Sequence, residues 1–149
     1  MAVRHATQDD LPLLKELSTE FRAVHKRGKQ LPYDEAAWLE ALDAAIGSDE
    51  MLVLILDEGA GFFVGAISAT PYAPIPVANE LVWYTKPESR GRGFALYRAF
   101  MRWAEGKNVE YVFLTMPEPT PALERLGFEV ADIGYFKKMP RAAAVRAAE

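Results

Sequence analysis

The sequence predicts an α/β domain built on a mixed, mostly antiparallel sheet with helices on both faces. Apolar segments of strand length alternate with segments whose apolar residues recur at helical spacing. Residues 51–56 and 62–70 flank a short Gly-rich turn, which predicts an antiparallel hairpin. Residues 80–85, a second Gly-rich turn, a helix and residues 110–116 follow as a crossover unit, so this part of the sheet is expected to be parallel.

The first helix has a clear start signal. A short strand is expected over residues 3–6, and Thr7 with Asp10 then resembles a capping box. The following residues predict a helix from about 9 to 24, because apolar side chains recur at helical spacing. These side chains are Leu14, Leu17, Phe21 and Val24.

The next segments alternate between expected loops and regular elements. Residues 25–30 are basic and contain Gly28, so we expect a loop there. A second helix is expected to begin near Asp34 and to end before Gly47, with Trp38 on its apolar face. Three prolines make residues 71–76 a rigid loop before the strand at 80–85.

The second half predicts a helix over residues 95–106, with Trp103 in the core, and a short helix near 122–126. A last strand or hairpin is expected from Gly127-Phe128 to about residue 139. We assign residues 1–140 to a single domain, and the Ala-rich tail 141–149 is expected to be a frayed helix.

Composition narrows the class of function. The chain has no cysteine and two histidines, so neither a thiolate nor a His-rich metal centre is expected. The net charge of -4 argues against nucleic acid as a partner. No apolar run approaches the roughly 20 residues of a membrane span, and the first ten residues lack an apolar signal core. We therefore expect a cytoplasmic protein that binds neither membrane nor nucleic acid.

The strongest chemical signal is the turn Arg90-Gly91-Arg92-Gly93, which joins a strand to an amphipathic helix. Glycines allow successive backbone N–H groups to face one concavity, and a helix start adds unpaired donors and partial positive charge. With the two arginines, this predicts a binding site for a diphosphate. The spacing matches neither a P-loop nor the Gly-x-Gly-x-x-Gly dinucleotide pattern.

Three separated motifs resemble the GNAT acetyltransferase family. Arg90-x-x-Gly93-x-Ala95 is similar to the cofactor motif of that family, and Thr85-Lys86-Pro87-Glu88 is similar to its lead-in. The opening Val3-Arg4-x-Ala6-x-x-x-Asp10 and the later Leu123-Glu-Arg-Leu-Gly127-Phe128 are also similar to family elements. The resemblance covers nearly the whole chain and implies the GNAT fold, with a splayed parallel pair at strands four and five.

The resemblance also implies an acetyl-CoA site. Amides of about Gly91 to Ala95 would bind the pyrophosphate, Arg90 would hold the turn or contact phosphate, and Arg92 would contact phosphate. The pantetheine arm would pair with the exposed backbone of the fourth strand. The complete set of expected cofactor-binding residues is Trp83, Tyr84, Thr85, Arg90, Gly91, Arg92, Gly93, Phe94 and Ala95.

The expected catalytic residues are Glu80 as base and Tyr135 as acid. Period two places Glu80 on the same strand face as Val82 and Tyr84. Tyr84 is an alternative acid by residue type, and His25, whose unperturbed pKa suits base work, is an alternative base.

The sequence departs from the family pattern near its end. Leu123 occupies the place where many members have a proton-donating Tyr, and the Pro-rich residues 117–121 replace a frequent Asn and resemble some phage-encoded members. The leading interpretation is transfer of an acetyl group to a small-molecule or peptide amine, with Tyr33 and Tyr72 lining the acceptor pocket. A non-catalytic acyl-CoA-binding or assembly module is the alternative. A homodimer is left open, and the acceptor is not indicated.

Overall fold

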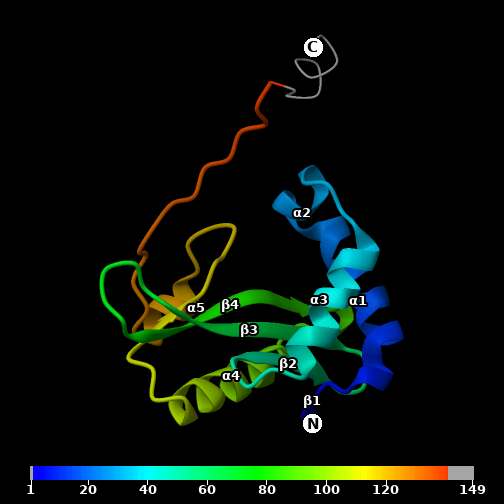
Figure 1. Cartoon of the computed structure of the whole chain (residues 1–149), viewed down its shortest axis with the longest axis horizontal. Coiled ribbons are helices and arrows are strands. Elements are labelled where there is room, and N and C mark those ends of the chain that lie inside the picture. Colours follow the sequence, from blue (N-terminus) through cyan, green and yellow to red (C-terminus); the bar gives the residue numbers. More distant parts are fainter. Residues whose placement is uncertain (1, 141–149) are drawn as a thin grey trace. The chain divides into compact units, whose positions relative to one another are not determined.

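The computed structural model describes residues 2–140 and contains one five-stranded sheet in the order β1-β2-β3-β4-β5 (Figure 1). The strands are β1 (Val3–His5), β2 (Met51–Leu56), β3 (Gly61–Ala69), β4 (Pro76–Thr85) and β5 (Tyr111–Phe113). Neighbouring strands pair antiparallel from β1 to β4, whereas β5 runs parallel to β4. The expected mixed, mostly antiparallel sheet is therefore confirmed.

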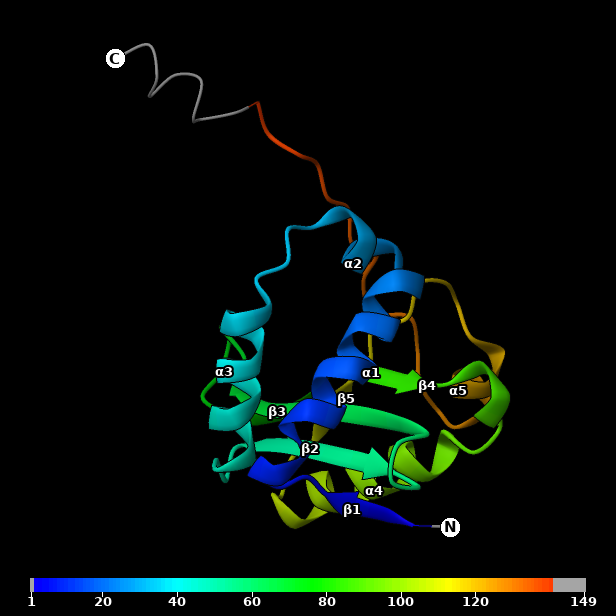
Figure 2. The same cartoon turned by 90° about the vertical axis from the view of Figure 1, so that its right-hand side faces the viewer.

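Helices cover both faces of this sheet (Figure 2). The described residues contain the helices α1 (Leu11–Val24), α2 (Lys26–Gln30), α3 (Glu35–Ile46), α4 (Phe94–Gly106) and α5 (Pro121–Arg125), with two 3-10 turns, η1 (Gln8–Asp10) and η2 (Pro87–Ser89). Side chains of α1 and α3 pack in the core cluster on one face, and side chains of α4 pack in the cluster on the other. One compact unit ends at Thr115 and contains the whole sheet, and a second unit begins at Met116.

The sequence of strand β2 is apolar without alternation because both of its faces are buried. Val53 and Ile55 belong to the core cluster that includes Leu14 and Leu17 of α1. Leu54 and its alternate neighbours belong to the cluster that includes Phe100 of α4. Because both faces of β2 are covered by helices, both sets of side chains must be apolar.

The chain start folds as the sequence indicates. The backbone N–H of Thr7 donates to the carboxylate of Asp10 over 2.7 Å, which confirms the expected capping box. Arg4 adds two hydrogen bonds to the same carboxylate, of 2.7 and 2.8 Å. The side-chain hydrogen bond from Arg4 lowers the pKa of Asp10 to about 2.

Two boundaries differ from expectation. The predicted loop at residues 25–30 is the short helix α2, whose first turn is capped by His25. Strand β4 begins at Pro76, where a loop was expected, and pairs with β3 from that residue onward. Proline is compatible with the first position of a strand. The proline-rich composition indicated a loop, but pairing with β3 extends β4 to Pro76.

The expected last strand or hairpin is wrong. Residues 128–140 contain no helix or strand, and Val130, Ile133 and Phe136 are exposed. A strand gains its hydrogen bonds from a partner, which alternating local sequence cannot supply, and Asp132 and Gly134 have low strand propensity. The expected frayed helix at 141–149 lies outside the described residues. Within residues 2–140, no helix combines the length and apolarity needed to cross a membrane.

Candidate functional site

The turn between β4 and α4 presents unused backbone donors. Gly91 has φ of 90°, a conformation that glycine adopts without strain. The N–H of Arg92 donates to Ser89 O (3.1 Å) and that of Ala95 to Arg92 O (3.1 Å). The N–H groups of Gly91, Gly93 and Phe94 have no acceptor among the described residues. These free donors at the start of a 13-residue helix fit an anionic group such as a diphosphate.

Close packing against β4 fixes this turn. Gly93 is buried, and a Cβ atom at this position would overlap Oγ1 of Thr85. The indole N–H of Trp83 donates to Gly93 O over 3.1 Å, and the Trp83 ring stacks on Tyr97 of α4 with centroids 5.9 Å apart. The glycine therefore permits close approach of the turn to the end of β4, and any larger residue would displace it.

The two arginines of the turn have different surroundings. Arg92 forms an ion pair with Asp57 in the β2–β3 turn, and its side chain is 50% exposed while that of Asp57 is 19% exposed. Arg90 is exposed at the surface of the turn. Both guanidinium groups remain candidates for contact with phosphate.

Strands β4 and β5 separate beyond a short paired region. Their pairing ends at Asn79 and Phe113, whereas β4 continues to Thr85. A register shift on the other side of β4 places Val82 opposite Val64 and Glu80 opposite Gly65, so Leu81 is a bulged residue. The expected splay between strands four and five is confirmed. It leaves the β5-facing edge of residues 80–85 outside the β4–β5 ladder.

The bulge changes the face on which Glu80 lies. Gly65, opposite Glu80, faces Phe100 of α4, because a Cβ atom there would meet the Phe100 ring at 2.8 Å. Val82 and Tyr84 instead belong to the cluster beneath α1 and α3. The prediction that Glu80 shares their face is wrong, since the extra residue Leu81 shifts the period-two alternation.

Glu80 lies where the two strands diverge. The backbone N–H of Thr115 donates to its Oε1 over 2.9 Å, and Glu80 is 9% exposed. Burial raises the pKa of Glu80, and the hydrogen bond from Thr115 opposes this in part. A carboxylate with a raised pKa is a better proton acceptor near neutral pH than an ordinary surface glutamate.

The α1 face of β4 carries an aromatic group that includes Tyr84. Phe21 of α1 makes edge contacts with Tyr84 (6.1 Å between ring centroids) and with Phe62 (6.5 Å), and stacks on His25 (4.8 Å). Burial and the carboxylate of Glu20 raise the pKa of the Tyr84 hydroxyl. Glu20 also forms an ion pair with Lys86 over 3.8 Å.

His25 has a structural task beside this group. Its Nδ1 accepts a hydrogen bond from the backbone N–H of Gly28 over 3.2 Å, so Nε2 is the nitrogen left for proton exchange with a substrate. Burial and the charge of Arg27 lower the pKa of His25. The neutral form therefore persists to lower pH than for an exposed histidine.

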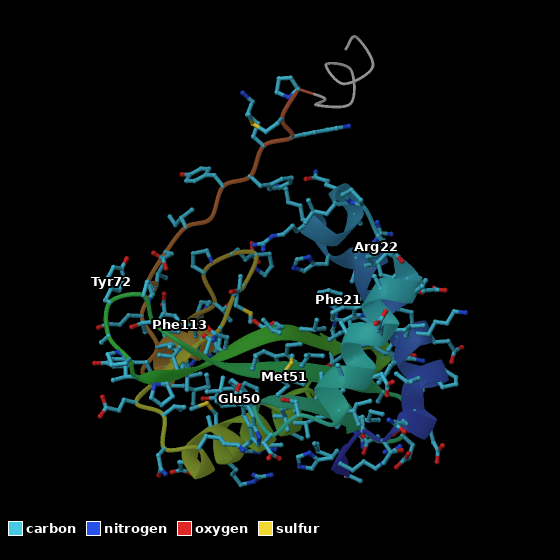
Figure 3. The ribbon with its side chains drawn as sticks, viewed as in Figure 1. Phe21, Arg22, Glu50, Met51, Tyr72 and Phe113 are labelled. Carbon is cyan, nitrogen blue, oxygen red and sulfur yellow. The ribbon has the colours of Figure 1, made fainter. Side chains whose placement is uncertain are left out.

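The two expected acceptor-pocket tyrosines are not brought together. The guanidinium of Arg22 lies 4.6 Å from the ring centre of Tyr33, so Tyr33 belongs to the α1 side. Tyr72 is 94% exposed in the loop before β4, and Figure 3 shows it well away from Arg22. The expected core residues Trp38 and Trp103 pack against the two core clusters.

Two of the discussed residues belong to the second unit. Leu123 of α5 is 8% exposed, and its carbonyl accepts from the N–H of Phe128 over 3.1 Å. Tyr135 is 91% exposed. Its assignment as the acid stays a prediction.

Three contributors to the site were missed by sequence reasoning. Each of them contacts a predicted site residue from a distant part of the chain. Asp57 of the β2–β3 turn pairs with Arg92, Thr115 just after β5 bonds Glu80, and Glu20 of α1 contacts Tyr84. For Asp57, the Asp-Glu-Gly turn was a signal of its position at a hairpin end. The local sequence around Thr115 and Glu20 gives no indication of their partners.

Comparison with known proteins agrees with this arrangement. The sequence model of the Acetyltransferase (GNAT) family matches residues 12–128. No curated protein sequence matches the chain.

Solved structures share the fold at low sequence identity. A putative acetyltransferase from Agrobacterium tumefaciens is 19% identical, with a TM-score of 0.70 over 93% of this chain and 100% of that one. A variant of the BH1408 protein from Bacillus halodurans is 18% identical, with a TM-score of 0.75 over 94% and 100%. An aminoglycoside acetyltransferase from an uncultured soil sample is 18% identical, with a TM-score of 0.68 over 93% and 96%.

Proposed function

The chain belongs to the GNAT acetyltransferase family, and from this premise we propose that it transfers an acetyl group from acetyl-CoA to a primary amine of a small molecule or peptide. The observation that carries this proposal is the set of free amides at Gly91, Gly93 and Phe94, beside the unpaired edge of β4. A diphosphate fits these donors, and a pantetheine arm fits the edge of an extended strand.

Acetyl-CoA, when bound, supplies an activated thioester with a stable thiolate leaving group. The chain's part is to bind the diphosphate at the turn, to align the arm along Trp83–Thr85, and to accept a proton from the amine. Glu80 is suited to the last task, because burial raises its pKa toward the working range of a general base. Its Thr115 hydrogen bond fixes one oxygen, which orients the carboxylate at the point where β4 and β5 separate.

The alternative is a non-catalytic acyl-CoA-binding or assembly module. One observation favours it: Leu123 is a buried apolar side chain where many family members carry a tyrosine acid. The retained turn and the buried Glu80 favour the enzyme, because cofactor binding alone does not require a buried carboxylate.

The decisive experiment incubates the full chain with acetyl-CoA and a panel of primary amines, and scores release of free thiol. An aminoglycoside belongs in the panel because one structural neighbour is named for that activity. Amine-dependent thiol release that is lost in Glu80→Gln supports the enzyme. Thermal stabilisation by CoA without turnover of any amine supports the module. Absence of stabilisation at millimolar CoA contradicts both.

A further inference from the structure

The β2–β3 turn lies directly beside the turn that precedes α4. The N–H of Lys86, at the end of β4, donates to Ala60 O over 2.9 Å. Asp57 of the same hairpin forms its ion pair with Arg92. Two contacts, one between backbones and one between side chains, therefore join these turns.

Asp57 is itself held firmly. Its Oδ1 accepts from the N–H of Ala2 over 2.9 Å, and its own N–H donates to Ala2 O over 2.7 Å. Asp57 and Glu58 have φ of 45° and 56°, in the left-handed region that non-glycine residues seldom adopt. Such conformations persist where surrounding contacts hold them, and they are common at functional sites.

A fixed carboxylate beside Arg92 has a consequence for anion binding. A half-exposed arginine has many rotamers, and ordering it at the moment of binding costs affinity. The ion pair orders the guanidinium before the ligand arrives. It also neutralises Asp57, whose free negative charge would repel a diphosphate.

We propose that Asp57 is a positioning residue that holds Arg92, and with it the phosphate-binding turn, in the arrangement that binds the cofactor diphosphate. This inference rests on the proposed function, because it concerns the same site. Asp57 acts through Arg92 and does not itself touch the cofactor.

Glu58 provides a matched control. It is the next residue of the same turn, has a similar φ and carries the same charge, but its carboxylate binds Arg4 through two hydrogen bonds of 2.8 Å. Asp57→Asn and Glu58→Gln therefore remove equal charge from one turn, and only the first breaks the contact to Arg92. Asparagine tolerates the left-handed conformation, so Asp57→Asn is expected to fold.

The experiment measures dissociation constants of CoA and of inorganic pyrophosphate by calorimetry on the full chain. Asp57→Asn should raise the dissociation constants of both ligands by about fivefold. Glu58→Gln should change these constants by less than about twofold, since exposed ion pairs contribute little. In an Arg92→Gln background, Asp57→Asn should cause no further loss, because both changes break one interaction. It should instead recover some affinity, since it removes the unpaired negative charge of Asp57. Asp57→Glu keeps the charge and should retain most of the affinity.

Several results would contradict the positioning role of Asp57. Unchanged or tighter binding in Asp57→Asn, an equal loss in Glu58→Gln, or an additive loss in the Arg92→Gln background overturns the positioning role. A loss for CoA but not for pyrophosphate also overturns it. If Asp57→Asn does not fold, near wild-type binding by Asp57→Glu together with weaker binding by Arg92→Gln supports the role, and binding equal to wild type by Arg92→Gln overturns it. Failure of the wild-type chain to bind CoA instead refutes the proposed function.

Discussion

The turn before α4 and the surroundings of Glu80 adjoin the same strand, but they are built from different kinds of contact. The turn offers backbone amides, and its key residue Gly93 acts through the absence of a side chain. Glu80 acts through a buried side chain that meets Thr115, 35 residues later. A site made of backbone groups depends on local conformation, whereas a site made of a buried charge depends on everything that surrounds it. The two regions should therefore respond differently to substitution.

The largest effect is expected for Glu80→Gln on catalysis. Glutamine keeps the size of the side chain and an acceptor for Thr115 but removes the basic carboxylate. We expect kcat/KM to fall on the order of 100-fold, in the range of general base catalysis, with CoA affinity unchanged. Steady-state kinetics with the amine found in the panel, from pH 6 to pH 10, measure this.

The pH profile sharpens that result. The defect should shrink at high pH, where more of the amine arrives already deprotonated. A change below about threefold at every pH, with normal CoA binding, would remove Glu80 from the mechanism and move the role to His25. A parallel loss of CoA affinity would show instead that Glu80 shapes β4.

Gly93→Ala should affect binding before chemistry. Its methyl group would overlap Oγ1 of Thr85, so the turn must move away from β4. We expect CoA affinity to fall by about tenfold or more, comparable to a packing cost of about 1 to 3 kcal/mol, with a smaller change in kcat. Calorimetry gives the affinity, and the double variant with Thr85→Ala, which removes the overlapping oxygen, should recover part of it.

Glu80→Gln should also stabilise the fold at neutral pH. The folded state raises the pKa of Glu80, so folding favours its protonated form. The stability that protonated Glu80 contributes is present below the unfolded pKa and is lost as pH rises through the folded pKa. The variant lacks this loss. We expect its free energy of unfolding to exceed that of the wild type by about 1 kcal/mol at pH 8, and this difference to disappear near pH 4. Urea unfolding at both pH values measures it, and equal stability at pH 8 would contradict a costly buried charge.

The smallest effect is expected for Leu123→Tyr. The thiolate is a stable leaving group, so restoring the common family tyrosine should change kcat by less than about threefold, well below the usual contribution of a general acid. Because Leu123 is buried, some loss of stability is also expected. A large rise in kcat at constant KM would show that the missing acid limits turnover, and would weaken the assignment of Tyr135.

The sequence by itself determined those parts that rest on local chemistry. The capping box at Thr7, the hairpin of β2 and β3, the crossover through α4 and the glycine turn all follow from nearby residues, and the structure contains each of them. Hydrogen bonds between residues a few positions apart, and helix or strand periodicity, are encoded where they act.

The tertiary structure decided what depends on distant partners. The bulge at Leu81 exists because β3 pairs on both sides of it, and it moved Glu80 to the α4 face against the alternation of its own strand. The hydrogen bond from Thr115 to Glu80 and the ion pair of Asp57 with Arg92 each join groups 35 positions apart along the chain. The raised pKa of Glu80 comes from its burial by the surrounding structure. Burial and charge pairing act through space, and residues 128–140 show that an alternating pattern forms no strand without a partner.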